Sequence, residues 1–162
     1  MADRTLVDLA RYNRGATERV LVAASRLAPA RRREPAPGTT GTIELTIAHL
    51  AGVERWFTAL IPDRPFEPPP EDPPWEELTR LVLADADALV ELIESLDEEA
   101  LDRLVDRHGY RMLARDLVLQ ALTHSHQHRT QVAAAVDVRG VPVTATDYYD
   151  WVVATEASTS SP

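Results

Sequence analysis

Three of the five histidines in this chain fall in one short segment, which reads Leu-Thr-His-Ser-His-Gln-His-Arg-Thr-Gln at positions 122–131. His124 and His128 are four residues apart, so on a helix their imidazoles lie on one face, one turn from each other. His126 is two residues from each and points to the opposite side. Neutral imidazole nitrogens are common ligands for zinc, nickel, copper and iron. The pair therefore indicates a metal clamp, whereas a lone histidine on an apolar face is more often a hydrogen-bonded core residue.

A third imidazole is available on another predicted helix. His49 interrupts an apolar stripe at helical spacing, as the pair does in its own helix. These two stripes are Leu45, His49, Val53, Trp56 and Leu60, and Leu113, Leu117, Ala121, His124, His128, Val132 and Ala135. We expect His49, His124 and His128 to point inward and converge. Three protein ligands leave a coordination position open, which is typical of catalytic zinc sites, whereas structural sites are usually closed by four.

His108 is the rival third ligand. It lies in the segment Asp-Arg-His-Gly-Tyr-Arg at 106–111, which has the composition of a turn. Histidines in turns usually face solvent, so His49 is preferred.

Four long helices must position these residues. The hydrophobic periodicity predicts them at about 4–27, 42–60, 73–96 and 113–138. Thr42 is expected to cap the second and Asp72 the third. The connector at 61–74 is rich in proline and extends at about 3.1 Å per residue, so it can cross the whole bundle. The third helix can then run parallel to the second.

The remaining segments are short. An extended pair is expected around the turn at 106–111. A last helix from Tyr148, capped by Thr146 and Asp147, is expected to place its aromatic residues as a lid over one end of the bundle. We interpret residues 1–154 as one domain and 155–162 as a disordered tail.

Three polar residues near the predicted site are candidates for a supporting or substrate-binding role. Asn13 falls on the apolar seam of the first helix, where it either sets the register or belongs to a polar site. Gln131, one turn beyond His128, can fix the tautomer of a ligating ring. Arg129 is expected to point away, as a salt-bridging or substrate-binding surface group. The run Arg31-Arg32-Arg33 is expected to be solvated.

The composition excludes several functional classes. The 162 residues include no cysteine, so neither a disulfide scaffold, a cysteine zinc site nor a thiol nucleophile of the protein itself is available. The formal net charge of −9 argues against nucleic-acid binding. Neither a signal peptide nor a membrane span is recognised, and we expect a cytoplasmic protein.

With these residues in place, the chain resembles the DinB-like, or DinB/YfiT, metalloenzymes. The histidine segment carries most of the resemblance, and the other matching positions follow it in order over nearly the whole chain. They are Tyr12-Asn13, residues 42–50, residues 54–56, residues 124–131, Gly140, Pro142 and residues 147–149. Two departures are Thr130, where glycine is common, and the additional His126.

The resemblance implies an all-α fold, a DinB-like four-helix bundle with up-down-down-up connectivity and a short C-terminal helical segment. It also implies a divalent metal on His49, His124 and His128, often in a homodimer. Zinc is expected first, with nickel or iron as alternatives. Relatives that use bacillithiol or mycothiol suggest a metal-dependent transferase that activates a small thiol for attack on an electrophile. The alternatives are a metal-binding or sensing bundle without turnover and a metal-dependent hydrolase, for which no inward-facing glutamate is evident as a base.

Overall fold

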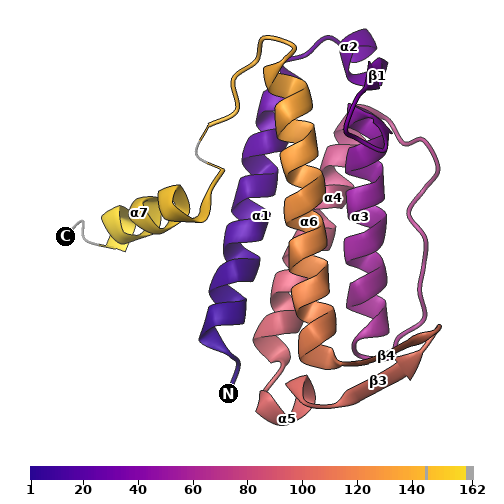
Figure 1. Ribbon diagram of the computed structural model, residues 1–162, viewed down its shortest axis with the longest axis vertical. Coiled ribbons are helices and arrows are strands. Elements are labelled where there is room, and N and C mark those ends of the chain that lie inside the picture. The colour runs from indigo at the N-terminus through magenta and orange to yellow at the C-terminus, as the bar shows by residue number, and fades with distance from the viewer. Residues whose placement is uncertain (145, 160–162) are drawn as a thin grey trace.

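Four long helices form the body of the protein in the computed structural model, which describes residues 1–144 and 146–159 (Figure 1). They are α1 Arg4–Ser25, α3 Ile43–Leu60, α4 Trp75–Ser95 and α6 Ala114–Asp137. The shorter elements are α2 Pro29–Arg33, β1 Pro35–Ala36, β2 Gly41–Thr42, α5 Glu98–Leu101, β3 Leu104–Arg107, β4 Tyr110–Leu113 and α7 Tyr148–Thr159. The helices α1 and α3 each pack against both α4 and α6. The predicted all-α bundle is confirmed.

The directions of the helices follow from the core. One apolar cluster contains the N-terminal parts of α1 and α6 and the C-terminal parts of α3 and α4, and a second cluster contains the opposite parts. The helices α1 and α6 therefore run one way and α3 and α4 the other, which is the predicted up-down-down-up arrangement. It requires the connector after α3 to return along the bundle, and Figure 1 shows the proline-rich segment doing so beside α3.

The two apolar clusters are separated by polar side chains at the same level of all four helices. Asn13 on α1, Glu54 on α3, Asp85 on α4, and Ser125 and Arg129 on α6 are all buried. On each helix these residues lie between the last member of one cluster and the first member of the other. We call these five residues the buried polar layer.

The core-facing stripe predicted for α3 is only partly confirmed. Leu60 is buried and Val53 and Trp56 pack against the core, but Leu45 is 57% exposed and His49 is exposed. The buried face also contains Ile43, Ile47, Leu50 and Phe57. Apolar residues occur nearly all round this helix, so the periodicity did not select a single face. His49 therefore lies at the rim of the bundle.

The predicted helix starts are partly confirmed. The Thr42 side chain accepts a hydrogen bond from the backbone N–H of Leu45, as expected of an N-cap. Asp72 does not cap the third helix: α4 begins after Pro74, which has no side-chain cap, and Asp72 lies earlier in the connector with φ of 45°. Proline at that boundary supplies the extended entry geometry that the cap was expected to provide.

The expected extended pair is an antiparallel hairpin of β3 and β4. His108 and Gly109 form its two-residue turn, with φ of 51° and 83°. Positive φ at both positions is the geometry of the tight hairpin turn that matches strand twist.

The C-terminal aromatic residues do not form a lid over an end of the bundle. The ring of Tyr148 contacts Tyr12 edge-to-face at 5.3 Å, and Trp151 lies 6.4 Å from the same ring. Figure 1 shows α7 at mid-height on the α1 side of the bundle, projecting outward from it. The helix runs to Thr159, into the segment expected to be a tail, and residues 160–162 lie outside the described residues. Within the described residues, no helix is long and apolar enough to cross a membrane.

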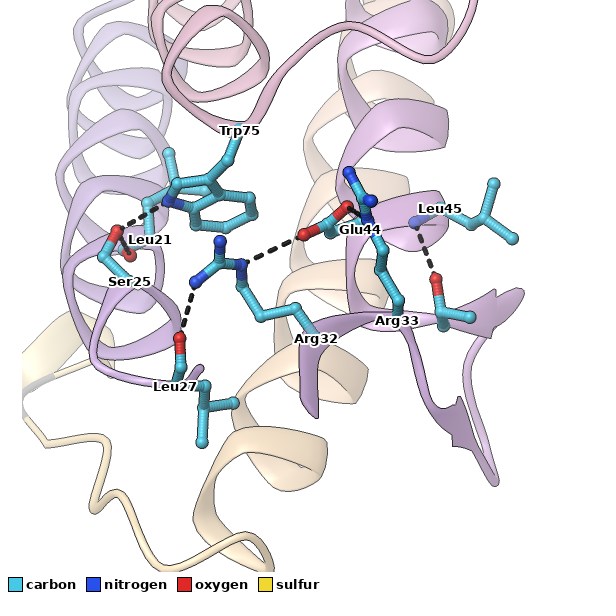
Figure 2. A network of polar contacts seen from close by, with 9 residues as sticks. Leu21, Ser25, Leu27, Arg32, Arg33, Glu44, Leu45 and Trp75 are labelled. Atoms are coloured by element: carbon cyan, nitrogen blue, oxygen red, sulfur yellow. Dashed lines mark hydrogen bonds and ion pairs between the residues drawn. The ribbon is translucent and has the colours of Figure 1, made fainter. Parts of the chain in front are cut away.

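The arginine run before α3 is not simply solvated (Figure 2). Arg32 is only 5% exposed; its Nε donates to Glu44 Oε1 at 3.1 Å and its Nη1 to the carbonyl of Leu27 at 2.6 Å. Its guanidinium lies 4.2 Å from the Trp75 ring centroid, and Arg33 Nε donates to the second Glu44 oxygen at 2.7 Å. This network joins the ends of α1, α3 and α4.

We therefore expect Arg32→Ala to lower the free energy of unfolding by about 2–4 kcal/mol, because it removes one partner of a buried ion pair and a cation–π contact. Arg31→Ala is the matched control: Arg31 is about half exposed and, among the described residues, forms an ion pair only with Glu34, so its loss is expected to cost less than about 0.5 kcal/mol. Urea unfolding monitored by circular dichroism measures both. Equal effects of the two substitutions would contradict the role of Arg32.

Candidate metal centre

The three histidines expected to form a metal site come together. His49 projects from α3, and His124 and His128 project from α6 toward it. Each offers one nitrogen, and no two of these nitrogens are more than 4.8 Å apart. The ring centroids are separated by 5.2 Å for His49 and His124, 4.7 Å for His49 and His128, and 4.3 Å for His124 and His128. The set joins two helices that are adjacent in space and far apart in sequence.

The cluster lies at the rim between α3 and α6, with one side open. His128 is buried, His124 is half-buried and His49 is exposed. Within the described residues, no carboxylate belongs to the cluster. A fourth position is therefore left for a molecule from solution, which is the arrangement of catalytic zinc sites.

Gln131 determines how His128 presents its lone pair. The Oε1 atom of Gln131 lies 2.8 Å from His128 Nδ1. An amide oxygen only accepts hydrogen bonds, so Nδ1 of His128 carries the proton and Nε2 is free to act as a ligand. This is the supporting role expected of Gln131, since a ligating histidine commonly donates its other N–H to such a partner.

The spacing of the rings fits a metal ion. Nε2 of His128 lies 3.1 Å from Nε2 of His124. Two nitrogens bound at about 2.0–2.1 Å to one tetrahedral zinc ion lie about 3.3 Å apart. His124 Nδ1 is buried without a hydrogen-bond partner among the described residues. The protein's own described groups thus leave one nitrogen of the half-buried His124 ring without a hydrogen bond. The three histidines can hold a divalent ion.

All shifts at the site favour neutral imidazoles. Burial, and after it the neighbouring His128 and His49, lower the pKa of His124 to about 4. Loss of hydration and then the proximity of His128 lower the pKa of His49. The neutral ring is the form that binds metal, so the site is ready to bind at neutral pH.

A cleft of about 450 Å³ adjoins the cluster at His124. It lies between α3, α6 and the hairpin, and it is open to solvent. The residues that line it are Val53, Trp56, Phe57, Tyr110, Met112, Gln120 and His124. A molecule in this cleft is next to the open side of the histidine cluster.

The buried polar layer contains a glutamate that the sequence analysis did not identify. Glu54 is fully buried; Ser125 Oγ donates to its Oε1 at 2.5 Å and Asn13 Nδ2 donates to the same oxygen at 3.4 Å. Burial raises the pKa of Glu54 to about 7, against the opposing effects of the Ser125 hydrogen bond and the charge of Arg129. The sequence signal for a buried Glu54 was its position on the helix, since Leu50, Ala51 and Phe57 flank it at helical spacing.

Arg129 is not a surface group, contrary to expectation. It is 2% exposed, and its Nη1 donates to the carbonyl of Asn13 at 3.2 Å and also to Asn13 Oδ1. Its guanidinium lies 5.3 Å from the ring centroid of Tyr12. Asn13 therefore belongs to a polar site in the core, the second of its two interpretations, and its bonds go to Glu54 and Arg129.

The two other histidines of interest lie outside the cluster. His126 is exposed on the far side of α6, where its Nδ1 lies 3.3 Å from Nη2 of Arg129. His108 is exposed in the hairpin turn. His49, and not His108, is the third member of the cluster.

Comparison with protein families gives one clear assignment. The sequence profile of the DinB superfamily matches residues 13–132, which run from the buried polar layer in α1 to the end of the histidine segment in α6. The chain belongs to the DinB superfamily. The resemblance seen in the sequence is thus confirmed, and the matched region of this DinB-superfamily protein contains all three clustered histidines. Comparison with curated proteins gives no match.

The raised pKa of Glu54 predicts a pH dependence of stability. Between its ordinary value of 4.5 and about 7, the folded protein binds more protons at this carboxyl than the unfolded chain does. The free energy of unfolding therefore falls as pH rises through this window, by up to about 3 kcal/mol, and levels off above it. Glu54→Gln removes that contribution.

We expect the stability of Glu54→Gln relative to the wild type to increase from pH 4.5 to about 7 and then to stay constant. His49, His124 and His126 contribute an opposite slope, because their pKa values are lowered, but they do so in both proteins and cancel in the difference. Urea unfolding of both proteins across this pH range measures the difference in their free energies of unfolding. Glu91→Gln, an exposed change on α4, controls for the loss of one negative charge. A difference that does not vary with pH would refute the assignment.

Proposed function

We propose that this DinB-superfamily protein is a metal-dependent transferase that activates a low-molecular-weight thiol for attack on an electrophile. The observation that carries the proposal is the open cluster of three imidazoles, His49, His124 and His128, beside a cleft large enough for a small molecule. A divalent ion bound there supplies Lewis-acid chemistry that favours the thiolate form of a thiol at neutral pH.

The thiol must come from a second molecule. The chain has no cysteine, so it contributes no sulfur nucleophile of its own. A small thiol of the mycothiol or bacillithiol type fits the expectation from the family. In the transfer, the thiol loses its proton to solvent, its sulfur forms a bond to the electrophilic carbon, and the leaving group departs with the electrons of the broken bond.

The protein's own residues then orient the ligating rings and bind the substrate. Gln131 holds the His128 ring in the tautomer that exposes Nε2, at 2.8 Å. The cleft beside His124 removes the organic part of the electrophile from water. Zinc is the first choice of metal because three imidazoles and an open position suit it; nickel and iron also accept imidazole.

In a metal-binding bundle without turnover, the C-terminal aromatic residues would block the site. Tyr148 and Trp151 of α7 instead contact Tyr12 on α1, and the cleft beside the cluster is lined by other elements. This favours a site that small molecules can enter. For the hydrolase alternative, Glu54 is an inward carboxylate, but its Oε1 is held by Ser125 and Asn13.

The metal site is tested by substitution within one helix. His124→Ala is expected to abolish stoichiometric metal binding, because two remaining imidazoles hold a divalent ion far more weakly than three. His126→Ala, two residues away on the same helix, is the matched control and is expected to retain the metal. Elemental analysis of the purified proteins measures their metal content, and circular dichroism checks that both keep their helices. Metal retained in His124→Ala would refute the ligand set.

The reaction is tested with the metal-loaded protein. We expect consumption of an electrophile, followed by chromatography, only when mycothiol or bacillithiol is also present, and at least about a hundredfold less in His124→Ala. Consumption without thiol would indicate the hydrolase instead. No consumption under either condition, with the metal fully bound, would favour the binding or sensing role.

A further inference from the structure

The cleft beside His124 has walls that are mainly aromatic. The Trp56 ring lies 4.9 Å from both the Phe57 ring and the Tyr110 ring, at interplanar angles of 71° and 54°. Tyr110 and Met112 come from the hairpin strand β4 and are 37% and 36% exposed. Flat side chains from a helix and a hairpin thus face a space that is accessible from outside.

Six of the seven lining residues have no formal charge. Val53, Trp56, Phe57, Tyr110 and Met112 are apolar or aromatic, and Gln120 is an uncharged amide. Against these side chains an anionic or cationic group would lose hydration without gaining a charged partner, and such burial is costly. A planar, uncharged ring can instead stack against the walls.

We propose that this cleft binds the uncharged aromatic portion of the substrate. The hairpin then acts as a specificity element, since it supplies one wall and contains none of the clustered histidines. Because the cleft adjoins His124, a ring bound in the cleft lies at the open side of the histidine cluster. The identification of that ring as part of the electrophile rests on the proposed function, whereas the binding itself does not require a metal.

The probe is 2-naphthol, a planar and neutral compound, titrated into the full-length protein by isothermal calorimetry at neutral pH. We expect saturable binding at one site. Tyr110→Ala removes a wall and Gln120→Trp fills the space, and each is expected to weaken binding by about tenfold or more. Leu119→Trp is the matched control, because Leu119 is 43% exposed on the same helix and does not line the cleft. Its affinity should be that of the wild type.

Two further titrations distinguish binding by the aromatic walls from binding by charge or by the metal. In protein freed of metal with a chelator, the anion 2-naphthalenesulfonate is expected to bind at least about tenfold more weakly than 2-naphthol, because the lining then offers it no cation. His49→Ala, which removes one member of the metal cluster outside the cleft, is expected to bind 2-naphthol as the wild type does. Retained binding in a protein without metal or turnover would support the cleft while the proposed function fails.

The proposal is overturned if 2-naphthol does not bind up to its solubility, or if Gln120→Trp binds it as well as Leu119→Trp does. It is also overturned if the sulfonate binds equally tightly. Loss of 2-naphthol binding in His49→Ala would show that the metal, and not the aromatic cleft, holds the ring. Circular dichroism of Tyr110→Ala and Gln120→Trp establishes that each variant is folded before its affinity is compared.

Discussion

A guanidinium buried in the middle of the bundle is the constraint on which the remaining structure depends. Arg129 is 2% exposed, and a charge taken out of water is tolerated only when its hydrogen bonds and its charge are compensated. Asn13 accepts from it through both backbone and side-chain oxygens, Tyr12 offers a ring face, and Glu54 lies close enough to lower the cost electrostatically. These partners come from α1 and α3. Satisfying Arg129 therefore fixes how α1, α3 and α6 lie along one another.

That register also positions the histidine cluster. Successive residues of a helix differ by about 100° in direction, so Arg129 and Ser125 point into the core while His124 and His128 point toward α3. A sliding of α3 against α6 would separate Glu54 from Ser125 and, in the same movement, His49 from the other two rings. The segment 124–131 thus presents the histidines of the cluster on one face of α6 and the residues of the buried polar layer on another. The polar layer interrupts the apolar core, and in return it determines a single alignment of the helices.

The histidine cluster is accessible because it lies at the rim of the bundle. A cluster in the centre of the bundle would be closed by the packing of four helices. At the edge between α3 and α6, His128 is buried and held by Gln131, whereas His49 is exposed and can adjust. The hairpin of β3 and β4 then extends the edge into a cleft. Firm support on one side and access on the other are what an open three-histidine site requires.

Much of this arrangement could be predicted from local patterns. Periodicity located the four long helices, Thr42 marked the start of one, and the proline-rich connector indicated that α4 runs parallel to α3. The spacing of His124 and His128 on one helical face, together with His49, named the three members of the cluster. These features depend on backbone geometry and on residues near one another in sequence, so they are readable before any packing is known.

The helices, their order and the identity of the clustered imidazoles can therefore be predicted from the sequence alone. Which face of each helix is buried depends on packing between helices: α3 is apolar nearly all round, and its core side is set by two neighbouring helices. Packing also places His49 at the rim, buries Arg129 near Glu54, and buries Arg32 against Glu44. Burial of a polar residue is set by the partners that other helices bring to it, and those partners are far away in the chain.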